Sequence, residues 1–157
     1  MTSDPRAAYL DALRLLARRE LSEAQVRQRL ARRRHSDDAI DEAIDRLREE
    51  RAIDDVRTAE AIARTQTSLK GRGELRVRQQ IERAGISPAT ARRVARDTFA
   101  GIDADELLAA SLRKRLRGRA QIADEAESQR LYRYLIGQGF EPDRVISALN
   151  RHKRRRS

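Results

Sequence analysis

The 157-residue chain contains no cysteine and no tryptophan, and only 3% of its residues are aromatic. Without cysteine there can be no disulfides, thiolate metal ligands or cysteine nucleophiles, and such a composition suits a reducing cytoplasm. The scarcity of aromatics excludes base stacking as the main mode of any nucleic-acid binding. It also leaves Leu, Ile, Val and Ala to build the core.

Proline and glycine are scarce too, with three and seven copies, while 39% of the residues are hydrophobic and 38% charged. These proportions are typical of a helical protein rather than a disordered one. Uncharged runs such as residues 134–140 are far shorter than the roughly 20 residues of a membrane-spanning helix. The N-terminus lacks the basic-then-apolar order of a signal peptide. We therefore expect a cytoplasmic protein with no membrane partner.

The net charge of +10 is unevenly distributed along the chain. Residues 1–56 hold 12 basic and 13 acidic side chains, residues 57–102 hold 10 and 4, and residues 103–157 hold 13 and 8. A basic field over the middle and the C-terminal third favours polyanions, above all nucleic acid. The alternative is a generally arginine-rich proteome, because lysine occurs at only three positions.

The sequence repeats three times. Offsets of 51 and 54 residues superpose the same apolar positions and the same helix starts. The matching sets are Val26, Val77 and Leu131; Leu30, Ile81 and Leu135; His35, Ile86 and Phe140; and Ile40, Ala91 and Val145. Ser36, Ser87 and Glu141 also coincide, and each precedes a residue suited to the first turn of a helix. Coincident starts in three places indicate a repeated unit.

Each repeat is predicted to contain three helices, and strand periodicity is absent. We expect an all-α fold, a tandem repeat of three three-helix units forming an elongated, curved molecule. The predicted divisions are residues 1–56, 57–102 and 103–150, followed by a basic tail over residues 151–157. The middle helices are predicted over about 56–69, 74–84 and 88–99. The predicted inward-facing residues include Leu10, Leu13 and Ala17, then Ile62 and Leu69, then Val145, Ile146 and Leu149.

Catalytic motifs are missing, and the candidate residues have simpler interpretations. His35 replaces Ile86 and Phe140 in the repeat, which predicts a packing role, and His152 is expected to be solvated in the tail. Gly71 is predicted to end a helix in the left-handed conformation, since its surroundings do not fit a phosphate-binding loop. The acidic cluster on residues 37–45 is spread around its helix and predicts a solvated helix start rather than a metal site. We expect no enzyme activity and no cofactor.

Basic side chains gather in several groups. Lys70 and Arg72 are expected to project from the turn after residue 69, near Arg76 and Arg78. Arg92 and Arg96 share one helix face by their spacing, and Arg113 and Arg117 do likewise. The side chains selected as candidate contacts to a partner or to DNA are Lys70, Arg72, Arg76, Arg78, Arg92, Arg96, Arg115, Arg117 and Arg119. The tail is expected to add attraction to nucleic acid without fixing a register.

The central segment resembles the bacterial RecX regulatory proteins. The resemblance lies in Asp54-Asp55, Arg57, Ala59 and Arg64, the Gly71-Arg72-Gly73 turn, Arg78-Gln79-Gln80-Ile81 and Gly85-Ile86. The Leu15-Leu16 region and Leu131-Tyr132-Arg133-Tyr134-Leu135 agree as well, so that about residues 8–150 are covered. The chain departs from the pattern at Arg34, where a helix-ending glycine is expected, at Thr58, where an aromatic is common, and at Arg72, where tyrosine is common.

The resemblance implies tandem three-helix repeats and binding to the RecA recombinase filament on single-stranded DNA. It implies restraint of the ATPase, strand-exchange and coprotease activities of RecA, with the molecule lying in the filament groove and no catalytic residues. We expect a monomer that contacts DNA mainly through phosphates. Two alternatives stay open: a general phosphate-directed nucleic-acid-binding helical protein, and a helical scaffold for an acidic protein partner.

Overall fold

The computed structural model describes residues 3–153, and all of its regular elements within that range are helical. They are α1 (Pro5–Arg18), α2 (Glu23–Arg32), α3 (Asp37–Glu49), α4 (Asp55–Arg64), the π-helical turn η1 (Thr65–Leu69), α5 (Glu74–Arg83), α6 (Pro88–Ala100), α7 (Ala104–Leu116), α8 (Glu125–Gly137) and α9 (Pro142–His152). The helix bounds predicted for the middle repeat agree with α4 plus η1, α5 and α6 to within a residue or two.

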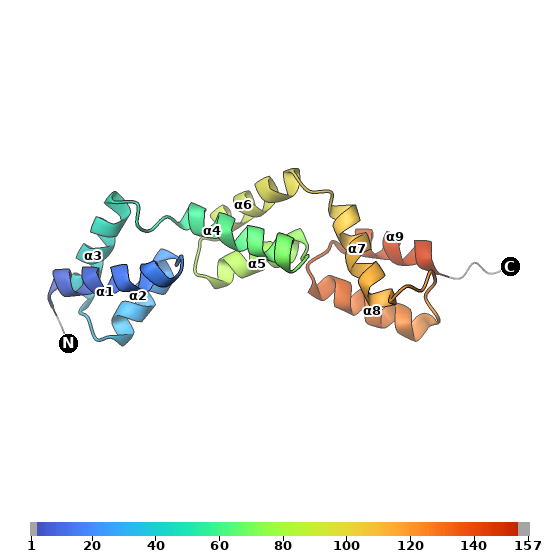
Figure 1. The fold of residues 1–157 in the computed structure, drawn as a ribbon, viewed down its shortest axis with the longest axis horizontal. Coiled ribbons are helices and arrows are strands. Elements are labelled where there is room, and N and C mark those ends of the chain that lie inside the picture. Colours follow the sequence, from blue (N-terminus) through green and yellow to red (C-terminus); the bar gives the residue numbers. More distant parts are fainter. Residues whose placement is uncertain (1–2, 154–157) are drawn as a thin grey trace.

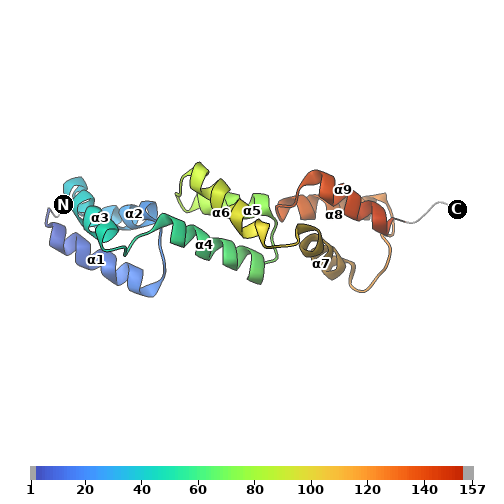
Figure 2. The ribbon, with the colours of Figure 1, turned by 90° about the horizontal axis from the view of Figure 1, so that it is seen from above.

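The helices form three units that follow one another along a single long axis (Figure 1). The first unit is α1 to α3, the second α4 to α6 and the third α7 to α9, and the view from above shows the same succession (Figure 2). Each unit has its own cluster of buried hydrophobic side chains, to which neighbouring units add little. The predicted all-α fold of tandem three-helix units is confirmed, whereas the limits assigned to each repeat stay predictions.

The repeat holds residue by residue in the middle and last helix of each unit. The middle helices end at Arg32, Arg83 and Gly137, and the last helices begin at Asp37, Pro88 and Pro142, which reproduces the offsets of 51 and 54 found in the sequence. The four sets of matched core positions, including His35 with Ile86 and Phe140, are all buried. A position in one unit therefore identifies the structurally equivalent position in the other two.

Local sequence explains where these helices begin. Ser22 forms a complete capping box with Gln25 at the start of α2. The hydroxyls of Ser36 and Ser87 accept from the backbone N–H groups of Ala39 and Thr90, which satisfies amides that the helix itself leaves free. Glu141 makes no such bond, so α9 starts on Pro142, whose fixed φ already suits the first turn.

The second and third units meet where the start of α5 abuts the turn that ends α8. The N–H groups of Gly73 and Leu75 donate to the carbonyls of Gln138 and Gly139, at 2.8 and 3.1 Å. Gly139 has a φ of +97°, and a Cβ built on it would lie 2.3 Å from the backbone nitrogen of Arg76. Glycine is thus required here twice, for the left-handed backbone and for the close approach.

The first and second units meet in the same way. The hydroxyl of Ser22, equivalent to Gly73, donates to the carbonyl of Ala84, equivalent to Gln138. Gly85 has a φ of +82°, and a Cβ on it would lie 2.5 Å from the Cβ of Ala24. In each contact, the start of one unit's middle helix packs against the glycine turn that ends the middle helix of the next unit. We call such a contact a joint. Two joints of one design connect the three units.

Arg34, the departure noted in the sequence, occupies the third copy of this glycine position. It adopts the same left-handed conformation, with a φ of +65°, and its side chain is exposed. Within residues 3–153 no unit packs against this turn, so no close approach excludes a Cβ. Only the conformational cost of about 1 kcal/mol for a non-glycine residue remains.

Several predicted inward-facing side chains point outward instead. Leu10 is 41% exposed, Leu69 81% and Ile146 47%. In α1 the buried residues are Ala8 and Ala12, which lie against α3 and leave Leu10 and Ala17 on the outer side. Leu69 ends the π-helical turn, whose wider winding breaks the 3.6-residue period from which an inward position was predicted.

Replacing Gly139 by alanine should weaken the second joint. Gly118 is a matched control because its φ is +86° but nothing lies within 4 Å of a Cβ built there. Both variants incur the left-handed strain, and Gly139→Ala adds the collision with Arg76, so it should lose about 1–3 kcal/mol more unfolding free energy. Urea unfolding followed by circular dichroism measures both. Equal losses would contradict the close packing of this joint.

Candidate partner and nucleic-acid surface

The middle unit holds cations without carboxylate partners. Within residues 3–153 the only ion pair that involves residues 57–102 joins Arg57 to Glu20 of the first unit. The first unit instead neutralises itself, for example through Arg27 with Asp41 at 2.6 Å and Arg46 with Glu50 at 3.0 Å. The excess positive charge of the middle unit is therefore available to an external anion.

Part of this charge surrounds the second joint. A hollow of about 540 Å³ lies beside it, and three arginines and one carboxylate of α5 are among the residues that line it: Arg76, Arg78, Arg83 and Glu82. Arg78 is half-buried and Arg83 exposed. The structure thus brings two predicted contact residues, Arg76 and Arg78, to one hollow. Arg83, which was not selected from the sequence, also lines this hollow. Its position at the end of α5 could have indicated it as a candidate.

Arg76 serves the joint itself. Its Nη1 donates to the carbonyl of Gly137 at 3.3 Å, and its Nε is buried without a partner among the described residues. Burial, together with the charges of Arg72 and Arg83, lowers the pKa of Arg76 below its usual range. Because two neighbouring guanidinium groups disfavour the charged form of Arg76, an anion bound there would stabilise this region.

The turn after η1 differs in part from its prediction. Gly71 does end the helix in the left-handed conformation, with a φ of +60°, and Lys70 is exposed. Arg72, however, does not project from the turn: it is half-buried, and its Nη1 donates to Oε1 of Gln66 at 2.9 Å. The π-helical turn places Gln66 where it can accept this bond, which the sequence did not indicate.

A second group of cations lies along α6. Arg92, Arg93 and Arg96 are all exposed. Their equivalents on α3, at an offset of 51, are Asp41, Glu42 and Asp45, so one helix of the repeat is acidic in the first unit and basic in the second. The acidic group is exposed, as predicted for a solvated helix start, and no cluster of metal-ligating side chains occurs in the described part of the chain.

The candidate cations of the third unit have local structural roles. The guanidinium of Arg115 stacks on the ring of Tyr134, 3.7 Å from its centroid. Arg117 is the left-handed residue that ends α7, so it does not share a helix face with Arg113 as predicted. Arg119 makes two hydrogen bonds to the carboxylate of Glu127, at 2.9 and 2.7 Å. These contacts leave the third unit less free positive charge than its sequence indicates.

The two histidines also have structural positions. His35 is buried, as predicted, and its Nε2 lies 2.7 Å from a carboxylate oxygen of Asp11. His152 is not solvated in a tail: it closes α9, its Nδ1 lies 3.0 Å from the carbonyl of Ala120, and its own carbonyl accepts from Ile122. The remaining tail residues from 154 onward lie outside the described residues.

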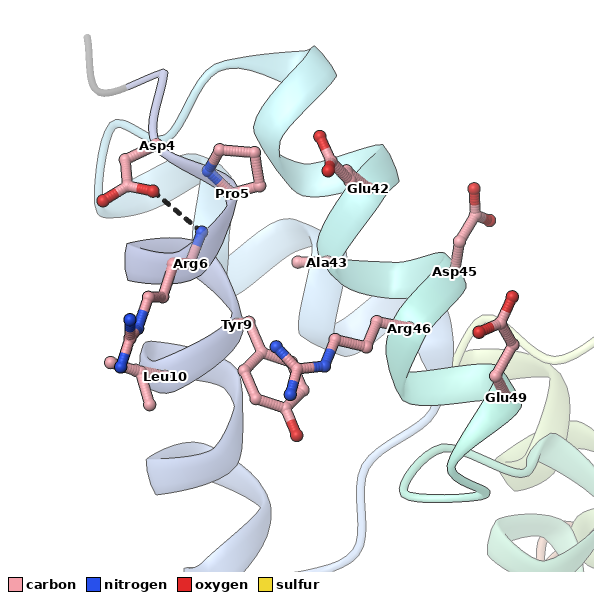
Figure 3. A pocket seen from close by; sticks show the side chains of 10 residues that line it. All are labelled: Asp4, Pro5, Arg6, Tyr9, Leu10, Glu42, Ala43, Asp45, Arg46 and Glu49. Atoms are coloured by element: carbon pink, nitrogen blue, oxygen red, sulfur yellow. Dashed lines mark hydrogen bonds between the residues drawn. The ribbon is translucent and has the colours of Figure 1, made fainter.

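A hollow of about 800 Å³ between α1 and α3 has no catalytic arrangement (Figure 3). The guanidinium of Arg46 stacks over the ring of Tyr9, 3.8 Å from its centroid, and the Tyr9 hydroxyl donates to Glu50 at 2.5 Å. This bond raises the pKa of Tyr9 and lowers that of Glu50. The charged side chains here hold α1 against α3.

Comparison with known proteins identifies the family. The model of the RecX first three-helix domain matches residues 8–47. The regulatory protein RecX of Halorhodospira halophila is 33% identical over 138 residues, which are 87% of this chain and 83% of that protein. The chain belongs to the RecX family. The RecX of Acidithiobacillus ferrooxidans is 35% identical over 153 residues, covering 98% of this chain and 93% of the relative.

Solved RecX structures share the fold. The crystal structure of RecX from Lactobacillus salivarius superposes with a TM-score of 0.72 over 94% of this chain and 95% of that one, at 21% identity. The relatives are named regulatory proteins, which fits a role other than catalysis for this RecX-family chain. None of its helices within residues 3–153 has the length and apolar character needed to cross a membrane.

The Arg119–Glu127 pair predicts a dependence of stability on pH. Bonds from Arg119 and from the backbone of Ala123 lower the pKa of Glu127 from 4.5 to about 2. Because the folded-state pKa is the lower one, the stabilisation is present above pH 4.5 and lost as the pH falls toward 2. The variant Glu127→Gln has no carboxylate at this position, so it should not show this acid-dependent loss of stability.

Thermal unfolding of the wild type and of Glu127→Gln at pH 7, 4.5, 3 and 2 checks this expectation. The difference in melting temperature between the two proteins should shrink over the acidic range, while other carboxylates affect both alike. A difference that stays constant from pH 7 to pH 2 would contradict the lowered pKa of Glu127.

Proposed function

We propose that this RecX-family chain regulates RecA by binding the RecA filament on single-stranded DNA. Lying in the filament groove, it would restrain the ATPase, strand-exchange and coprotease activities of RecA. The observation that carries the proposal is the middle unit, whose cations other than Arg57 lack carboxylate partners within residues 3–153 and which sits between two other units of an extended array. Family membership supports RecA as the regulated protein.

The extended arrangement suits a groove. Each unit has its own core and the units follow one another along one axis, so the molecule presents a long surface rather than an enclosed pocket. A long surface can contact several successive subunits of a filament at once, and the resulting effective concentration strengthens weak individual contacts. The unpaired cations of the middle unit add attraction to the DNA phosphates or to acidic protein surfaces.

The test is the single-stranded-DNA-dependent ATPase of RecA, measured together with strand exchange at increasing concentrations of this protein. We expect both activities to fall as the protein saturates the filament. If neither changes at saturating concentration, the proposal is wrong.

A charge-reversal variant locates the surface. Changing Arg92, Arg93 and Arg96 to glutamate alters three exposed side chains that form no ion pair among the described residues. Inhibition should then require about tenfold more protein, because favourable contacts become repulsive. The matched control changes Arg6, Arg18 and Arg19, likewise exposed, to glutamate with the same change in net charge. An equal loss of inhibition in both variants would assign the effect to net charge alone.

A second candidate is general phosphate-directed binding of nucleic acid, which the same unpaired cations favour. It predicts tight DNA binding in the absence of RecA, with an affinity that falls steeply as salt rises. Undetectable binding to DNA alone at low salt would exclude it.

A further inference from the structure

One pair of surface positions has a different chemistry in each unit. In the first unit it holds Arg27 on α2 and Asp41 on α3, whose side chains form an ion pair at 2.6 Å across the two helices. The offset of 51 gives Arg78 on α5 and Arg92 on α6, and the further offset of 54 gives Tyr132 on α8 and Ile146 on α9. The pair is therefore neutralised in the first unit, doubly positive in the second and apolar in the third.

The backbone supports this equivalence. The middle helices end and the last helices begin at matching residues in all three units, and α5 packs on α6 as α2 packs on α3. The buried residues Val26 and Val77 directly precede Arg27 and Arg78, while Ile40 and Ala91 directly precede Asp41 and Arg92. Arg78 and Arg92 thus stand where a cation and its carboxylate partner stand in the first unit.

We propose that Arg78 and Arg92 form a phosphodiester site, in which a DNA backbone phosphate takes the place of the Asp41 carboxylate. The equivalence places two guanidinium groups here with no carboxylate to pair them, and an anion held between them would accept hydrogen bonds from both. The proposal deepens the function proposed above, on which it rests, by naming DNA phosphate as the ligand of this part of the middle unit.

The arrangement along α6 favours a polyanion over a single protein carboxylate. Arg96 lies one helical turn beyond Arg92 on the same face, about 5–6 Å away between Cβ atoms. Both side chains are exposed, and neither has an ion-pair partner within residues 3–153. A row of cations one turn apart matches a chain of successive phosphates, and binding through phosphates does not require the aromatic side chains that the sequence lacks.

The repeat itself supplies the test variants. Arg92→Asp rebuilds in the second unit the ion pair of the first, so the fold should be kept while the site is neutralised. Asp41→Arg does the reverse and should create a second site beside Arg27. The probe is a fluorescent oligothymidylate without RecA, titrated over a range of salt concentrations and followed by anisotropy.

Arg92→Asp should weaken binding about tenfold and reduce the salt slope by about 0.7, the value expected when one phosphate of a single strand is no longer neutralised by the protein. Asp41→Arg should strengthen binding severalfold. Two controls with equal changes in net charge, Arg6→Asp and Glu49→Arg, lie away from the paired positions on exposed parts of α1 and α3 and should have smaller effects. Circular dichroism confirms that each variant is folded.

Two results would overturn the site. If each control changes the affinity and the salt slope as much as the variant with the same change in net charge, binding responds to net charge only. Oligothymidylate binding unchanged by Arg92→Asp, with binding to RecA alone reduced, would assign the arginines to an acidic protein surface. Because the oligothymidylate titration contains no RecA, and binding to RecA is measured separately, failure of the site is distinct from failure of the RecA ATPase assay.

Discussion

The contact on which the arrangement depends is a helix start that donates hydrogen bonds to the carbonyls of a neighbouring helix end, through the Ser22 hydroxyl at the first joint and through backbone N–H groups at the second. The first amides of a helix and its last carbonyls have no partners within it, and opposite partial charges gather at the two ends. At the second joint the N–H groups of Gly73 and Leu75 donate directly to the carbonyls of Gln138 and Gly139. One polar contact thus fixes the neighbour's position without a shared hydrophobic core, which lets each unit keep its own core while the array extends.

Much of this architecture follows from the sequence because repetition averages out local ambiguity. A single apolar residue such as Val26 could belong to many patterns, but three residues at constant offsets must occupy equivalent sites. The helix starts at Ser36 and Ser87 were predictable for the same reason. The joints were not, since they involve backbone atoms and the absence of side chains, and periodicity carries no information about which turn approaches which helix.

The errors at Leu10, Leu69 and Arg72 share a physical origin. Hydrophobicity identified the larger side chain as buried, whereas α1 lies against α3 through alanines. Helical periodicity failed at Leu69 because the π-helical turn changes the winding, and the same turn brings Gln66 to Arg72. Charge counts identified the basic unit but could not separate paired from unpaired arginines. Arg119 bonds to Glu127 and Arg115 stacks on Tyr134, whereas Arg92 and Arg96 have no ion-pair partner in the described part of the chain.

The turn at Arg34 shows that the glycine requirement belongs to the neighbour and not to the turn. All three turns adopt a left-handed backbone, yet only the two that receive a preceding unit, at Gly85 and Gly139, lack a Cβ. In an array built with such joints, each glycine at this position marks one connection. Counting these glycines in a sequence of this architecture therefore counts its joints, and a side chain at the same position marks a turn against which no other unit packs.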